Sequence, residues 1–171
     1  MSDKGLAGTS MRKLANACDL NVAALYHYFP SKQALFEAVI AERQYGNRIA
    51  EAPPVDQSAP LEDRLRQLFT NVWQGAMTEE PVWRLLLGEG LRSEPIALPV
   101  GGELLDALPA AMAVWISESA PELPDPQAAA QIFVGQMFSG FIHHILQPDR
   151  STSEIAEQHC DVLVSMLCRT D

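Results

Sequence analysis

The sequence predicts an all-α fold, and three observations lead to that prediction. Apolar residues recur at spacings of three and four over most of the 171-residue chain. No segment alternates between apolar and polar residues for long enough to indicate a strand. Residue types that favour helix N-termini precede several of the periodic segments. Since 47% of the residues are hydrophobic, the chain is long enough to bury a sizeable core.

The first predicted elements are two short helices joined by a tight turn. Thr9 or Ser10 can cap the first helix, whose apolar face holds residues 11, 14 and 15. Residues 18–20 form the turn, and Asn21 caps a second helix over residues 22–28. A helix, a turn and a second helix with small residues at its start is the geometry that contacts bases in a DNA major groove.

A third helix follows directly. Pro30 ends the preceding helix, because the residue before a proline is pushed out of the α region. Ser31 then caps a helix whose apolar stripe consists of Leu35, Phe36, Val39 and Ile40. A stretch rich in proline and acidic residues, 51–60, marks a break. We therefore divide the chain into a helix-turn-helix part with its connecting helix, residues 1–50, and a helical body, residues 51–171.

Five further helices are predicted in the second part. Asp125 followed by Pro126 is a cap with proline at the first helical position, and Ser151 with Glu154 forms a capping box. Pro109 lies inside one of the helical patterns, where it removes a backbone hydrogen bond and is expected to kink the helix. The helices are expected at about residues 61–77, 81–92, 102–119, 126–146 and 151–169.

The last two helices indicate how the protein assembles. Residues 132–146 are apolar nearly all round, so this helix has to be covered on both sides. One cover is the protein's own core, and the other is a second subunit or, alternatively, more of the same subunit. Gly135, Ser139 and Gly140 are small enough to let a partner helix approach. We therefore expect a homodimer that forms through the last two helices.

Charge is distributed unevenly along the chain. Six basic and four acidic residues give residues 1–50 a net charge of +2, so residues 51–171 carry −12 of the overall −10. This asymmetry is expected if only the N-terminal part approaches phosphates. The alternative, that acidity keeps the body soluble, explains the −12 but not the asymmetry.

Neither a membrane protein nor an enzyme is indicated. No signal peptide is visible, and no run approaches the roughly 18 apolar residues of a membrane span. Cys160 and Cys168 are expected to be buried as small hydrophobic residues in a reducing, cytoplasmic protein. His143 and His144 point about 100° apart on a helix and have no further ligand four positions away. Since no catalytic motif is present either, we expect no enzymatic activity, no metal and no cofactor.

The segment from Leu25 to Lys32 carries a family resemblance. It contains Tyr-x-x-Phe, from Tyr26 to Phe29, with a lysine three residues after the phenylalanine, behind the helix-turn-helix pattern. This arrangement resembles the DNA-binding region of the TetR/AcrR family of one-component bacterial transcription regulators, with the close match over about residues 5–45. The resemblance implies a ligand-responsive regulator, most often a repressor, that binds a palindromic double-stranded DNA operator as a homodimer. It also implies a four-helix dimer interface made by the last two helices of each subunit.

The predicted DNA contacts follow from side-chain chemistry and from the resemblance. Tyrosine and histidine can donate to phosphates or bases, and a lysine at a helix start adds charge near a phosphate. Small residues at a helix start let it enter the groove and meet thymine methyl groups. Packing remains an equal alternative for Tyr28. The predicted contacts are Thr9, Ser10, Asn21, Val22, Ala23, Ala24, Tyr26, His27, Tyr28 and Lys32.

The resemblance implies that residues 1–50 are the DNA-binding region and that residues 51–171 are an effector-binding and dimerisation domain with an effector pocket between its helices. The aromatic and apolar candidates here imply a small, largely apolar effector, although an ordinary core role is the alternative for each of them. The candidates are Phe69, Trp73, Trp83, Met112, Trp115, Phe133, Met137, Phe141 and His144.

Two departures from the family pattern matter. Asp19 stands in the turn where the family usually has glycine, but aspartate tolerates the left-handed conformation better than most residues. The family also has a helix before Gly5, and the four preceding residues are too few to form it. This chain is therefore expected to dimerise and bind ligand but to bind DNA poorly. The alternative function is a helical ligand sensor or interaction module without DNA binding.

Overall fold

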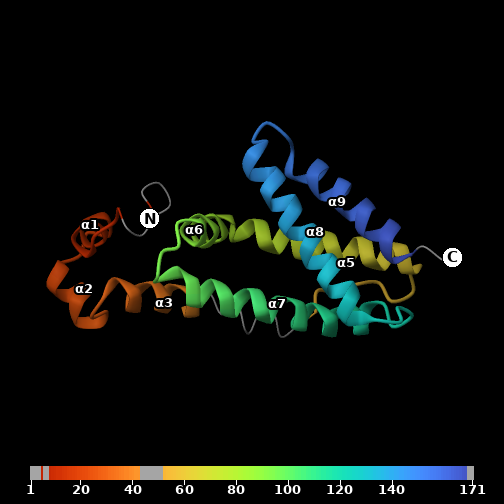
Figure 1. Cartoon of the computed structure of the whole chain (residues 1–171), viewed down its shortest axis with the longest axis horizontal. Coiled ribbons are helices and arrows are strands. Elements are labelled where there is room, and N and C mark those ends of the chain that lie inside the picture. Colours follow the sequence, from red (N-terminus) through yellow and green to blue (C-terminus); the bar gives the residue numbers. More distant parts are fainter. Residues whose placement is uncertain (1–4, 6–7, 43–51, 169–171) are drawn as a thin grey trace. The chain divides into compact units, whose positions relative to one another are not determined.

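The computed structural model describes residues 5, 8–42 and 52–168, which form helices and turns without a strand (Figure 1). The predicted all-α fold is confirmed. The described helices are α1 (Met11–Ala17), α2 (Val22–Tyr28), α3 (Lys32–Glu42), α5 (Leu61–Thr78), α6 (Glu80–Leu91), α7 (Ala97–Ser119), α8 (Pro126–Leu146) and α9 (Thr152–Leu167).

The chain forms two compact units that interleave along the sequence. The first unit comprises Met1–Arg48 and Glu79–Leu105, and the second comprises Ile49–Thr78 and Asp106–Asp171. Helix α7 therefore begins in the first unit and ends in the second. The functional division at residue 50 stays a prediction. The expected lack of a helix before Gly5 concerns residues 1–4, which lie outside the described residues.

The predicted caps of the first unit are present. The hydroxyl of Ser10 accepts from the Lys13 N–H at 3.3 Å, and the side chain of Asn21 accepts from the Ala23 N–H at 2.8 Å. Each cap satisfies a backbone donor that a helix start leaves unpaired. Phe29, which precedes the proline, is extended (φ −130°, ψ 99°) and ends α2 as expected.

Asp19 closes the turn between α1 and α2. Its φ of 57° lies in the left-handed region, as the sequence predicted for the residue that replaces the usual glycine. The Leu20 N–H donates to the Ala15 carbonyl oxygen at 2.8 Å, and the Asp19 N–H donates to that of Asn16 at 3.3 Å. This pair of bonds is a Schellman motif, which fixes where α1 ends and therefore how α2 leaves it.

A small core joins α1 to α2. Met11 and Ala15 of α1 and Leu25 of α2 are buried together, with Leu14 and Phe29 partly buried against them. Leu25 points into this core and Val22 packs partly against it, so the other five residues of the short helix α2 face solvent.

The second unit holds the larger core. Helices α5, α7, α8 and α9 contribute buried side chains to it, and α9 packs against both α5 and α8 (Figure 1). Asp125 caps α8 and Ser151 caps α9, both as predicted. The largest side chains without any exposure in this core are Leu65, Leu68, Phe69, Ile116, Phe133, Ile155 and Leu163.

Gly140 has a different role from the one expected. A Cβ atom at Gly140 would lie 2.8 Å from Cζ3 of Trp73 and 3.2 Å from Cδ2 of His159, so this glycine is needed inside the subunit rather than for a partner helix. A Cβ atom at Gly135 would meet nothing within 4 Å. Gly135 and Ser139 are exposed on α8 and remain candidates for a close approach by a partner.

Helix α7 is longer than predicted and begins at Ala97 rather than near residue 102. By length and mean hydropathy (1.3) this helix could cross a membrane. The sequence analysis expected no segment of this kind, because polar residues interrupt the apolar ones. Glu103 and Asp106 interrupt its apolar character, and Met112 and Ile116 are part of the core of the second unit. The C-terminal half of α7 therefore forms part of this core, although only 17% of the apolar window of the helix is buried.

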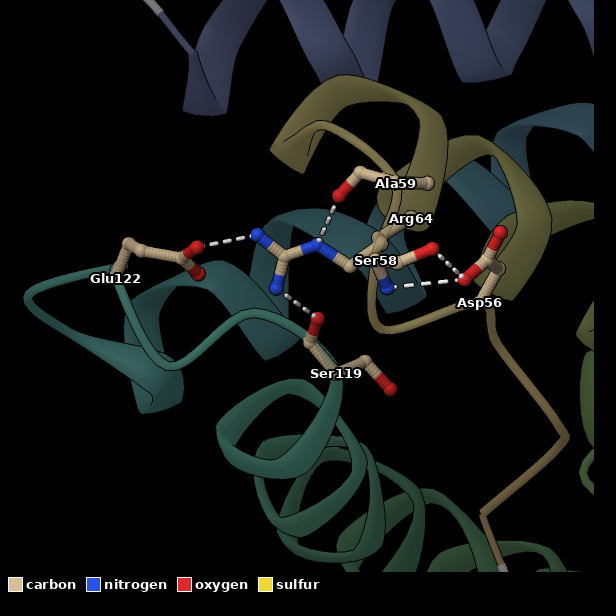
Figure 2. Close-up of polar contacts among 6 residues, drawn as sticks. All are labelled: Asp56, Ser58, Ala59, Arg64, Ser119 and Glu122. Atoms are coloured by element: carbon tan, nitrogen blue, oxygen red, sulfur yellow. Dashed lines mark hydrogen bonds and ion pairs between the residues drawn. The ribbon is translucent and has the colours of Figure 1, made fainter.

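A buried arginine ties the start of α5 to the loop that follows α7 (Figure 2). The Arg64 guanidinium donates to the Ala59 carbonyl oxygen at 3.0 Å and to that of Ser119 at 2.8 Å, and it pairs with the Glu122 carboxylate. The hydrogen bond from Arg64 lowers the pKa of Glu122. Because each of the three guanidinium nitrogens donates one hydrogen bond, the buried charge of Arg64 is paired.

Candidate nucleic-acid interface and effector site

Helix α2 presents most of the predicted DNA-contacting side chains to solvent. Ala23 and Ala24 are exposed at its start, and Tyr26, His27 and Tyr28 are exposed along the rest of it. Tyr26 is 51% exposed and Tyr28 is 75% exposed, so neither ring serves the core. The His27 and Tyr28 rings meet edge to face, with centroids 5.4 Å apart. The helix therefore carries small residues at one end and hydrogen-bond donors at the other.

The remaining predicted contacts lie around this helix. Ser10 and Asn21 are exposed caps, Val22 is partly buried, and Lys32 opens α3.

Thr9 is placed differently from the other predicted contacts. Its side chain is buried, and its hydroxyl donates to the Gly5 carbonyl oxygen at 2.8 Å. Arg12 and Lys13 form an exposed basic pair in the first turn of α1. The sequence analysis did not include them among the predicted DNA contacts. The positive charge beside the Ser10 cap could have indicated them.

Most predicted effector residues belong to one aromatic and apolar cluster. Phe69 stacks on Trp73 (centroids 6.4 Å, planes 9° apart) and tilts against Phe133 at 5.2 Å. Met112 and Trp115 of α7 join the same cluster, and Met137 packs against it. Phe141 is buried and His144 is half-buried on α8. Trp83 is half-buried on α6, in the first unit.

A chain of three polar side chains links α8 to α9. His143 Nδ1 lies 2.8 Å from His159 Nε2, and His159 Nδ1 lies 2.8 Å from the Gln136 side-chain oxygen. Because that oxygen only accepts, His159 donates from Nδ1, and in the neutral form of the ring its Nε2 accepts from His143. Burial is the main cause that lowers the pKa of His159. The described residues contain no group of three metal-ligand side chains.

Helices α8 and α9 both leave large apolar side chains in solvent. Ile142 is 42% exposed and Leu146 is 72% exposed on α8. Val162 is 40% exposed and Met166 is 51% exposed on α9. Hydrophobic side chains of this size that face water on two packed helices are typical of a surface that another subunit covers.

An open groove of about 560 Å³ between α5 and α9 was not predicted. Arg66 of α5 pairs with Asp161 of α9 there, and Cys168 lies at its edge. Burial raises the pKa of the Cys168 thiol and that of Cys160, which favours the protonated form of both, although Cys168 is only half-buried rather than buried as expected. Cys160 is buried in the core, as expected, whereas Cys18 is exposed.

Comparisons with known proteins point to one family. Residues 1–39 match the model of the family described as bacterial regulatory proteins, tetR family. The chain is 30% identical over 73 residues to Probable HTH-type transcriptional regulator YttP of Bacillus subtilis, which is 42% of this chain and 35% of that protein. It is 24% identical over 96 residues to HTH-type transcriptional regulator UidR of Escherichia coli K12, which is 56% of this chain and 48% of that protein. The matches therefore span about a third to a half of these relatives.

Solved structures share the fold over nearly the whole chain. GusR of Salmonella enterica has a TM-score of 0.69 at 21% identity and covers 98% of this chain and 89% of its own. Flavonoid-responsive Regulator FrrA has a TM-score of 0.61 at 25% identity, with 97% and 88% covered. AibR, solved with isovaleryl coenzyme A and operator DNA, has a TM-score of 0.59 at 23% identity, with 97% and 90% covered.

Proposed function

We propose that this chain, whose residues 1–39 match the tetR family of bacterial regulatory proteins, is a homodimeric, ligand-responsive transcription regulator. It binds a palindromic DNA operator through α1 and α2 of each subunit and acts as a repressor. The observation that carries the proposal is α2, a helix fixed by the Asp19 turn and exposed along its polar side. A helix of this kind supplies the side chains that contact base edges, while its neighbours contact phosphates.

The proposed contacts divide by chemistry. Ala23 and Ala24 bring the start of α2 close to base edges, and Tyr26, His27 and Tyr28 donate to phosphates or bases. Ser10, Asn21, Val22 and Lys32 complete the surface. We add Arg12 and Lys13 as phosphate contacts, because both are basic and exposed. Thr9 acts through its bond to Gly5, which orders the backbone that leads into α1.

The test of DNA binding starts with selection from a randomised duplex library, using the 171-residue chain and a form extended by the codons before Met1. Affinity for the selected site is then measured by fluorescence anisotropy between 50 and 200 mM salt. Counterion release predicts a loss of about a thousandfold or more over that range if six or more phosphates are contacted. A folded protein that enriches no sequence and has no salt-dependent association would be a sensor or interaction module instead.

A matched pair of variants makes the test specific to α2. Ala24→Glu places a carboxylate on the proposed DNA surface, and Ala110→Glu adds the same group at an exposed alanine of α7. Like-charge contact costs several kcal/mol, so Ala24→Glu should bind the selected site at least about 100-fold more weakly, and Ala110→Glu should bind like the wild type. Equal effects of the two variants would contradict the assignment of α2.

The proposed dimer forms through α8 and α9. Two exposed apolar residues, Leu146 of α8 and Met166 of α9, are the best positions to test it. Leu146→Glu or Met166→Glu should convert the dimer to a monomer in sedimentation equilibrium, because a buried charge without a partner opposes association. Leu91→Glu, at a leucine that is 89% exposed on α6, is the control and should leave the dimer intact. A dimer that survives both α8 and α9 variants would exclude this interface.

The effector is proposed to bind in the second unit among the aromatic residues of α5, α7 and α8. FrrA is named for its response to flavonoids, and AibR was solved with isovaleryl coenzyme A, so small molecules of different chemistry are associated with regulators of this fold. An effector that binds one spacing of the two DNA-binding regions better than another shifts the population between DNA-competent and DNA-incompetent states. An in vitro transcription assay on the selected site distinguishes repression from activation.

A further inference from the structure

A hydrogen-bonded pair of histidines joins α8 to α9 inside the second unit. His143 Nδ1 lies 2.8 Å from His159 Nε2, and the side-chain oxygen of Gln136 lies 2.8 Å from the other nitrogen of the His159 ring. His159 is 4% exposed, whereas His143 is half-buried. The buried ring is therefore held on both sides, and the half-buried ring gives protons from solvent access to the pair.

The pair can hold one additional proton but not two. His143 donates from Nδ1, so a proton added to its Nε2 leaves the bond between the rings intact. A second proton has to go to His159 Nε2, which is the acceptor of that bond. Two N–H groups then face each other across 2.8 Å, and two positive charges this close repel each other strongly in a buried site. Double protonation therefore forces the two rings apart.

The surroundings of His159 do not offset the second charge. Among the described residues, the charged groups that act on this ring are His143 and Arg150, and both oppose its protonation. Apart from His143, α8 contributes an amide oxygen and α5 an uncharged tryptophan ring to its surroundings. Asp161, the next acidic residue along α9, pairs with Arg66 of α5. Burial of the ring lowers its pKa in the same direction.

The pair lies beside the apolar surface through which the dimer is proposed to form. Ile142, adjacent to His143, is 42% exposed, and Leu146, three residues after His143, is 72% exposed. Val162, three residues after His159 on α9, is 40% exposed. Residues three apart on a helix are neighbours on its surface. Contact between the two rings therefore fixes how the apolar side chains of α8 are placed relative to those of α9.

We propose that the His143–His159 pair is an acid-sensitive latch, which holds α8 on α9 while at most one additional proton is bound and opens when both rings are charged, so that the dimer weakens in acid. This inference rests on the proposed dimer through α8 and α9 and adds its regulation by pH. Only the closed arrangement presents the apolar side chains of the two helices together. The apparent affinity of the dimer therefore falls with the fraction of subunits that are closed.

The test is sedimentation equilibrium of the intact protein at pH 7.5, 6.5 and 5.5 and constant ionic strength. The dissociation constant of the dimer should rise at least about tenfold from pH 7.5 to 5.5, which corresponds to closure of about a third or fewer of the subunits at the lower pH. In His143→Gln the amide supplies a donor that does not titrate, so the rise should be below about threefold. Asp149→Asn removes an exposed titratable side chain from the turn between the same helices and should retain the full rise.

A second readout on the wild-type protein does not depend on whether the variants fold. Long-range ¹H–¹⁵N NMR spectra distinguish protonated from unprotonated imidazole nitrogens, and Nε2 of His159 should stay unprotonated at pH 6.5 and gain its proton as the dimer dissociates. A dissociation constant that does not change with pH, an equal rise in the wild type and in His143→Gln, or a His159 Nε2 already protonated at pH 7.5 would each overturn the latch and leave the dimer in place. A protein that is monomeric at pH 7.5 would instead refute the proposed dimer interface, and the latch with it.

Discussion

Gly140 of α8 has no room for a side chain, and this makes it a sensitive probe of the core of the second unit. A Cβ atom there would lie 2.8 Å from Cζ3 and 3.2 Å from Cη2 of Trp73, and 3.2 Å from Cδ2 of His159. Both neighbours are rings on other helices rather than the ends of flexible chains. Gly140→Ala therefore forces α8 away from α5 or α9, or turns a buried ring.

The expected loss is the difference between two opposing effects. Replacing a glycine inside a helix by alanine gains about 0.5–1 kcal/mol. An extra methyl group in a filled core costs about 1–3 kcal/mol. Gly140→Ala should therefore lower the free energy of unfolding by about 1 kcal/mol, and by at most about 2.5 kcal/mol. Gly75→Ala, at an exposed glycine of α5 where a Cβ meets nothing within 4 Å, should raise it by about 0.5–1 kcal/mol.

The measurement is urea unfolding followed by far-ultraviolet circular dichroism at one fixed protein concentration, because the stability of the proposed dimer would depend on concentration. Trp73→Phe removes the two ring atoms that the new methyl group meets. The double variant with Gly140→Ala should therefore show a favourable coupling of about 0.5–3 kcal/mol. If Gly140→Ala stabilises the protein as much as Gly75→Ala does, or if the double variant is simply additive, the described packing of α8 on α5 is wrong.

Three further predictions concern His159, Asp19 and Gly5. Because burial lowers the pKa of His159, this histidine binds a proton more readily in the unfolded chain than in the folded one. The free energy of unfolding should therefore decrease as pH falls below about 6.5. His159→Gln should reduce the difference between the free energies of unfolding measured by urea titration at pH 7.5 and at pH 5.5. Asp19 has a φ of 57°, so Asp19→Gly should leave the thermal midpoint unchanged or raise it. Asp19→Val should lower the free energy of unfolding by about 1–2 kcal/mol, because a β-branched residue is strained in this conformation. Gly5 has a φ of 65°, and a Cβ atom there would lie 2.4 Å from Glu89 Oε1. Gly5→Ala should therefore lower the free energy of unfolding by about 2 kcal/mol and the thermal midpoint by a few degrees.

Gly90→Ala is the control for Gly5→Ala, because a Cβ atom at Gly90 of α6 meets nothing within 4 Å. An equal loss of stability in the two variants would contradict the contact between Gly5 and Glu89. A pH dependence that is unchanged in His159→Gln would assign it to other groups. Asp19→Val as stable as Asp19→Gly would mean that the turn does not need a left-handed residue.

Local signals in the sequence predicted the helices well. The caps Ser10, Asn21, Ser31, Asp125 and Ser151 are all formed, because a cap depends only on residues two or three positions away. The start of α7 was missed since Pro99 and two glycines weaken helix propensity there. Tertiary contacts override such weak preferences, as the burial of Ala97 indicates.

Contacts between distant residues could not be predicted from one sequence. Arg64 and Glu122 are 58 positions apart, and His143 and His159 are 16 positions apart on different helices. The sequence likewise gave no sign that Thr9 turns inward to bond the Gly5 carbonyl oxygen. The candidate DNA contacts on α2 were predictable because burial of one leucine sets the orientation of a seven-residue helix. Which aromatic residues share a core required the structure.

The interleaving of the two units limits how this protein can be recombined with its relatives. The chain passes between units near residues 48, 78 and 105, so the unit that contains α1 and α2 is not one continuous segment. A chimera joined at residue 50 would take Met1–Arg48 from one parent and Glu79–Leu105 from the other, and the two parts would have to form one unit without having evolved together. Exchange of operator specificity between homologues should therefore succeed by grafting the surface residues of α2 onto this chain, and it should fail by transplanting the N-terminal segment alone.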